Sequence, residues 1–140
     1  MNDIEQINDL FDEVYQGLKD DIFEKDVYGC RLFLQPPNNS YLPNVQMYNE
    51  NKYLGEETLD YQERRYPIEF KVEVYAEDTT VANKFIITSV IESVVASYMR
   101  KQGFKIQQSR PILNLDTNVR RVLMRFTALY DIENKIVYKR

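Results

Sequence analysis

Two stretches in which every second residue is apolar limit most strongly what this chain can fold into. In residues 67–76, PIEFKVEVYA, every second side chain from Ile68 to Val74 is apolar. In residues 122–130 the same alternation runs from Val122 to Tyr130. A period of two residues is that of a β-strand with one buried face and one solvated face. Both stretches therefore predict half-buried strands of a sheet.

Two helices are predicted from a different periodicity. Near the N-terminus, apolar residues from Ile4 to Leu18 recur at helical spacing, and acidic side chains fill the opposite face. A second helix is expected to start after Asp78 or Thr79, as the N-cap, and to end at Gly103. Its apolar arc is too wide for a helix on a surface. We expect it to pack on the sheet and to be covered elsewhere, first of all by the N-terminal helix.

The remaining strands are shorter. They are predicted at residues 30–35, at about 45–48, at 104–113 with a break near Pro111, and at the C-terminus. The order of elements favours an α+β fold: a mostly antiparallel sheet with two helices packed on one face. At 140 residues the chain has the length of one domain. Its predicted parts are a helix over 3–24, a polar, tyrosine-rich excursion over 36–66, a sheet-and-helix core over 67–131, and a C-terminal strand or arm over 132–140.

The composition of the chain argues against most catalytic and metal sites. The chain has no histidine, so it lacks the commonest general base and metal ligand. Its one cysteine, Cys30, allows no internal disulfide, and we interpret it as a structural thiol. The loop that starts at Asn114 resembles a calcium loop only briefly, because its sixth position is Val119 and its twelfth is Arg125. We expect no enzyme, no cofactor, no metal and, from the apolar runs, no membrane span.

The polar excursion carries four tyrosines that we predict to contact a partner. A loop of that length in a small domain is usually functional or mobile, and tyrosine is enriched at contact surfaces. The alternative is an ordinary extended hairpin. The four residues are Tyr41, Tyr48, Tyr53 and Tyr61.

Three arginines in the last long strand pose the main question of the sequence. The alternation points Arg121 and Arg125 away from the core, whereas Arg120 has core-face parity at the start of the strand. Glu69 and Glu73 have the same outward parity in their own strand. If the two strands pair, the charges form cross-strand ion pairs on a solvated face. The other interpretation makes all five residues candidates for a subunit interface.

Charge is divided unevenly along the chain. Residues 1–66 have a net charge of −8 and residues 67–140 one of +4, which together give the −4 of the whole chain. An acidic protein is not typical of dedicated nucleic-acid binders. The division has two interpretations: an acidic helix beside a mildly basic sheet, or copies that associate head to tail through unlike surfaces.

The second half of the chain resembles a family of tailed-phage proteins, the tail terminators or tail-completion proteins. The resemblance lies in YPIEFKVEVYAED, in a helix that ends YMRKQGF, and in NLDTNVRRVLMRFTALYD, and covers residues 66–131. It implies a small α+β subunit of a ring, commonly a hexamer, that caps the tail tube, meets the head-tail connector and lets DNA pass through its lumen without specific binding. It also implies a place in the virion, assembled in the bacterial cytoplasm. The excursion departs from the part that matches.

Two other functions stay open on the sequence alone. One is a different neck protein of the same particle, such as a head-closure subunit. The other is a non-viral cytosolic module that binds a protein or peptide through its tyrosine-rich excursion.

Overall fold

A computed structural model gives the fold, and it describes residues 3–34, 41–49, 65–113 and 116–139. Two helices and six strands make an α+β fold with a mostly antiparallel sheet, as the sequence predicts. No described helix is long and apolar enough to cross a membrane. In chain order the elements are α1 (Asp3–Lys25), β1 (Arg31–Phe33), β2 (Asn44–Asn49), β3 (Arg65–Glu77), α2 (Lys84–Lys101), β4 (Lys105–Ile112), β5 (Val119–Asp131) and β6 (Ile136–Lys139).

The sheet is built around the pairing of β3 with β5. The strand order is β1-β2-β3-β5-β4, and β6 also pairs with β5. Only β1 and β2 run parallel. Phe70 lies opposite Phe126 and Val72 opposite Met124, so the two alternating stretches put their apolar residues on one face. That face is buried, which confirms the predicted orientation of both strands.

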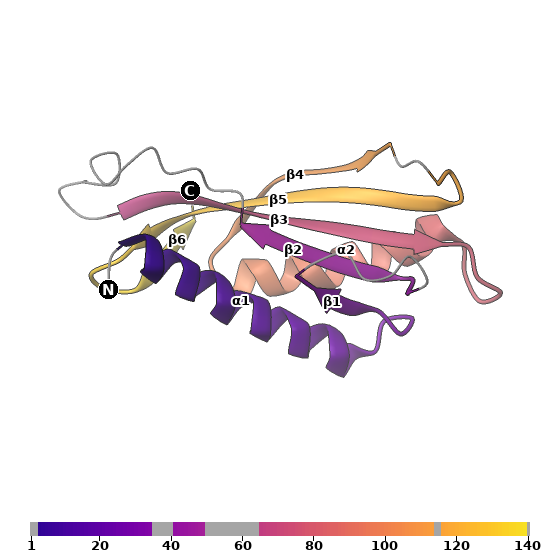
Figure 1. Ribbon diagram of the computed structural model, residues 1–140, viewed down its shortest axis with the longest axis horizontal. Helices are drawn as coiled ribbons and strands as arrows, with labels where there is room; N and C mark the ends of the chain where they lie inside the picture. Colours follow the sequence, from indigo (N-terminus) through magenta and orange to yellow (C-terminus); the bar gives the residue numbers. More distant parts are fainter. Residues whose placement is uncertain (1–2, 35–40, 50–64, 114–115, 140) are drawn as a thin grey trace.

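Both helices cover this apolar face and leave the other face of the sheet without a described helix (Figure 1). The stripe of α1 is buried, and its Phe11 ring meets the edge of Phe70 at 5.1 Å between centroids. Helices α1 and α2 touch where the Tyr98 ring lies over Gly17. The described core residues of both helices and the sheet form one cluster.

The prediction that α2 is largely covered is wrong for its N-terminal half. There Phe85, Ile86 and Val90 stay 56%, 49% and 38% exposed. The start of α2 also differs from the prediction, because the N-cap is Asn83, whose side chain accepts a hydrogen bond from the Ile86 amide. The Asp78 side chain instead accepts from the Lys84 amide. The Thr79 side chain accepts from the amides of Val81 and Ala82.

The end of α2 follows the prediction. Gly103 takes the left-handed backbone conformation with φ +92°, and the Phe104 amide donates to the Met99 carbonyl at 3.0 Å. This pattern closes a helix with a glycine after its cap residue.

Strand β4 differs from the expectation of a break near Pro111. The strand continues to Ile112, and its irregularity is a register shift between Ile106 and Gln108. Pro111 is tolerated because β4 is an edge strand among the described strands, where a missing amide donor costs no ladder hydrogen bond. The C-terminal prediction of a strand holds as β6. Of the excursion, residues 41–49 and 65–66 are described, and its centre lies outside the described residues.

Candidate functional site

The outer face of the sheet carries a ladder of ion pairs between β3 and β5. Glu73 lies opposite Leu123 and Glu69 opposite Thr127, so each glutamate reaches the arginine two residues before its direct partner. The Arg125 Nε donates to Glu69 at 2.9 Å and the Arg121 Nε donates to Glu73 at 2.6 Å. Both contacts are diagonal with the same offset. The sequence predicted cross-strand pairs if these strands met, and they do.

The two rungs of the ladder differ in burial. The Glu73 side chain is only 6% exposed, whereas that of Glu69 is 24% exposed. A carboxylate as buried as Glu73 needs a charged partner, and Arg121 supplies it. Burial acts to lower the pKa of Arg121, but the hydrogen bond and charge of Glu73 outweigh it and raise that pKa. The Glu73–Arg121 pair is therefore a fixed part of the sheet.

Tyr75 supports the buried rung. It lies directly opposite Arg121, whose guanidinium carbon is 5.6 Å from the centre of the Tyr75 ring. Burial and the nearby charge of Glu73 raise the pKa of Tyr75. The phenol stays neutral at physiological pH and provides a flat surface for the arginine.

Among the described residues, cations outnumber acids on this face once β4 is counted, whereas β3 and β5 alone carry equal numbers of the two. Lys71 lies directly opposite Arg125, and Arg110 of β4 lies opposite Leu123. Strand register therefore puts these two additional cations on the same face as the ladder. Half-buried Leu123 and Leu129 share it as well. The face is a mixture of arginine, leucine and tyrosine, which is typical of contact surfaces.

Arg120 is separated from the other interface candidates. It turns to the helix side of the sheet, where its Nε donates to the Thr88 hydroxyl at 3.1 Å and its guanidinium lies over the Phe85 ring at 4.8 Å. Its core-face parity was correctly predicted. The structure brings together Glu69, Glu73, Arg121 and Arg125, and places Arg120 against α2.

Two of the four tyrosine candidates, Tyr41 and Tyr48, lie in the described residues. The Tyr41 hydroxyl donates to the Gly29 carbonyl at 3.1 Å, and its ring meets the edge of Phe33 in β1. Tyr48 is half-buried in β2, opposite Lys71. Tyr53 and Tyr61 lie outside the described residues.

Sequence reasoning missed a groove between α1 and β1. It has a volume of about 530 Å³ and its walls include Phe23, Arg31 and Leu34. Two large apolar side chains at the groove stay exposed in the structure, Phe23 by 61% and Leu34 by 49%. In the sequence, neither residue departs from the apolar periodicity of its own helix or strand clearly enough to predict a groove.

Reactive groups are not gathered in the described part of the chain. It holds no group of three or more potential metal ligands. Cys30 is fully buried, and this burial raises the pKa of its thiol to about 12. No protein-family model and no curated protein matches the sequence.

Proposed function

We propose that this protein is a structural subunit of a phage tail, a tail terminator that acts by assembly and not by catalysis. The observation that carries the proposal is that unlike charges occupy opposite sides of the molecule. The solvent-facing side of α1 is acidic, whereas the described outer face of β3, β4 and β5 has more cations than acids, with Lys105 and Arg110 of β4 giving the excess. The fold agrees with the small α+β subunit that the family resemblance implies.

The acidic side is formed by residues that α1 exposes along its whole length. Lys19 and Lys25 are the exposed cations of the same helix, and Lys25 is paired with Asp21 at 3.0 Å. The helix therefore keeps a surplus of negative charge. The exposed acids are Glu5, Asp9, Asp12, Glu13, Asp20 and Glu24.

A contact between two unlike patches of neighbouring copies is heterologous, and it closes into a ring when the rotation between copies closes. We propose that α1 of one copy faces the ladder side of the sheet of the next. Charge complementarity of this kind sets the orientation of partners and the rate at which they meet. In that setting the ring, a hexamer by the resemblance, joins the tail tube to the head-tail connector, and DNA passes through its lumen.

Charge reversal tests this proposal. The variant R121E/R125E is expected to lose rings and to run as a monomer in light scattering and negative-stain microscopy, alone and with tail tubes. Reversal of the opposing acids, D9R/D12R, is expected to restore assembly in that background. Salt is expected to weaken the wild-type ring, because screening shortens the reach of exposed charges to about 8 Å at 0.15 M.

The matched control is K101E/K135E, which makes the same change in net charge at exposed positions outside the ladder. It is expected to assemble as the wild type does. Circular dichroism checks that each variant is folded. If R121E disturbs the buried Glu73, R125E alone replaces the double variant, because its rung is more exposed. Unchanged rings in R121E/R125E, or only monomers of the wild type both alone and on tails, would refute the proposal.

A further inference from the structure

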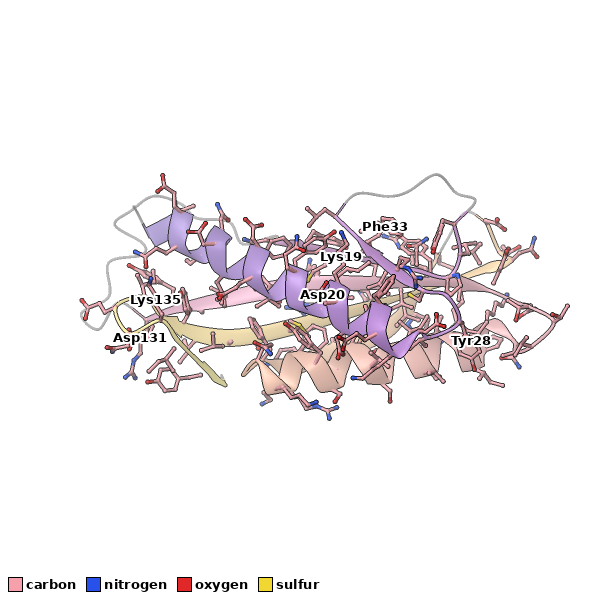
Figure 2. All side chains as sticks on the ribbon, turned by 90° about the horizontal axis from the view of Figure 1, so that it is seen from below. Lys19, Asp20, Tyr28, Phe33, Asp131 and Lys135 are labelled. Atoms are coloured by element: carbon pink, nitrogen blue, oxygen red, sulfur yellow. The ribbon has the colours of Figure 1, made fainter. Side chains whose placement is uncertain are left out.

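The groove beside α1 follows the free edge of the sheet. Arg31, Leu32, Phe33 and Leu34 all line it, although Leu32 faces the buried side and its neighbours do not. Side chains that point to opposite faces of a strand can share one groove only if the groove runs along the edge of the strand. Lys19, Asp20 and Phe33 mark it in Figure 2, where α1 passes β1.

One backbone edge of β1 has no described strand beside it. Of the strands that the structure describes, only β2 pairs with β1. An edge strand presents unpaired amide and carbonyl groups that another extended chain can pair with. At about 3.3 Å per residue, the three residues of β1 offer an edge of roughly 10 Å.

Positive charge is held at the walls by aromatic rings. The Arg31 guanidinium lies 4.6 Å from the centre of the Phe23 ring and donates to the Cys30 carbonyl at 2.8 Å. The Lys19 ammonium lies 6.0 Å from the centre of the Tyr15 ring. Asp20 is the one acid of the lining, so the groove is net positive on a chain that is net negative.

Apolar surface completes the groove. Tyr15 and Leu32 are buried and lie deepest, whereas Phe23 and Leu34 remain largely exposed at its margins. The volume of about 530 Å³ is in the range of sites that hold small ligands or a few residues of a peptide. An occupant that fits needs backbone groups to pair, carboxylates for the two cations, and apolar side chains for the rest.

We propose that this groove binds an extended, acidic segment of another protein, which adds to the sheet as a strand beside β1. Main-chain hydrogen bonds to the edge supply affinity, and the alternate side chains of the segment supply specificity. Its carboxylates lie near Lys19 and Arg31, and its apolar side chains lie on Phe23 and Leu34. Strand register puts Arg31 and Phe33 on the same face of the sheet as the ladder, with β1 two strands from β3. The oligomeric state of each variant is therefore measured beside peptide binding.

Binding of a synthetic probe tests the proposal on the full chain. The probe is a fluorescent peptide of alternating glutamate and valine, six residues long, and its anisotropy is followed as protein is added. Saturable binding is expected. K19E/R31E is expected to weaken it at least about tenfold, because a reversed charge repels the carboxylates. K19E alone changes only an exposed side chain, and it is expected to weaken binding in the same direction if R31E disturbs the fold.

Three controls separate strand addition from non-specific attraction. K105E removes an exposed cation of β4 and is expected to leave binding unchanged. A peptide with lysine in place of glutamate is expected not to bind. A peptide methylated on alternate backbone nitrogens, with the same charge, is expected to lose binding because it can no longer donate to the edge.

Four results would overturn the proposal. They are no binding of the acidic probe at millimolar protein, equal binding of the lysine peptide, equal binding of the methylated peptide, and equal loss in K105E. If K19E/R31E instead changes the oligomeric state without any peptide, the occupant is a second copy of this chain and not a segment of another protein.

Discussion

At the scale of single residues, Cys30 combines burial with a neighbouring charge. Its thiol is fully buried just before β1, and burial raises its pKa to about 12, against the partial opposing effect of Arg31. The thiolate is the reactive form of cysteine. Reactivity should therefore be limited by opening of the fold.

We predict that Cys30 in the native protein reacts with a disulfide reagent at pH 8 at least about a thousandfold more slowly than a free cysteine, since each pKa unit changes the thiolate fraction about tenfold. The rate is measured by absorbance, and the control is the same protein in denaturant, where the ordinary rate should return. A native rate equal to the denatured one would show that the thiol is accessible.

Gly17 is the residue on which the contact between the two helices depends. A methyl group at this position would lie 2.9 Å from the Cζ atom of Tyr98 and closer still to its hydroxyl. The hydroxyl end of Tyr98 therefore occupies the space that a Cβ at position 17 needs, and the Tyr98 side chain has to shift to admit one. Glycine inside a helix costs roughly 0.5–1 kcal/mol relative to alanine, so the contact must offset that cost.

At the scale of elements, we predict that the effect of Gly17→Ala changes sign with residue 98. In the wild type, G17A should lower the free energy of unfolding by about 1–3 kcal/mol through overpacking. In a Y98A background the same change should raise it by about 0.5–1 kcal/mol, because only helix propensity remains. Urea unfolding of the four proteins measures this. An equal effect of G17A in both backgrounds would show that the helices do not meet there.

The turn between β5 and β6 depends on Asp131, which lies at one end of the molecule, away from Lys19, Asp20 and Phe33 (Figure 2). Its carboxylate accepts from the Asn134 amide at 3.1 Å and from the Asn134 side chain at 2.9 Å. These bonds, with a smaller effect of Arg65, lower the pKa of Asp131 below its ordinary 3.8. A lowered carboxyl pKa stabilises the folded state above the unfolded pKa, and the effect is lost as pH falls through the folded value.

We predict that Asp131→Asn unfolds more easily than the wild type at pH 7, and that the difference between them shrinks as pH falls below about 4. Urea unfolding at a series of pH values measures both proteins. Glu133→Gln, which alters an exposed acid of the same turn, should follow the wild type throughout. A difference that stays constant down to pH 2 would exclude the Asp131 carboxylate as its cause.

The elements differ in how far the sequence predicts them. The alternation in β3 and β5 is decisive because each has one buried face. The sequence does not decide where α2 starts, because the side chains of Asp78, Thr79 and Asn83 all accept hydrogen bonds from backbone amides. The cap is then decided by the path of the chain between β3 and α2. The register shift in β4 also has no signal in the residues around it, whereas Pro111 is the residue that suggests a break.

At the scale of the whole molecule, the sequence predicts charges but not their neighbours. Outward parity of Glu69, Glu73, Arg121 and Arg125 follows from alternation, and their contact follows only once β3 pairs with β5. The uneven burial of the two rungs comes from the surrounding strands. The groove depends on the angle at which α1 crosses β1, and no residue pattern specifies that angle.

The two sides of the sheet differ in what they allow. Strand β4 carries a bulge, a proline and exposed Lys105 and Arg110, all of which discourage a further strand from adding there. Strand β1 is short and has neither a bulge nor a proline, and its one charge is the half-buried Arg31. Among these two edge strands, addition of a further strand is therefore favoured at β1 over β4.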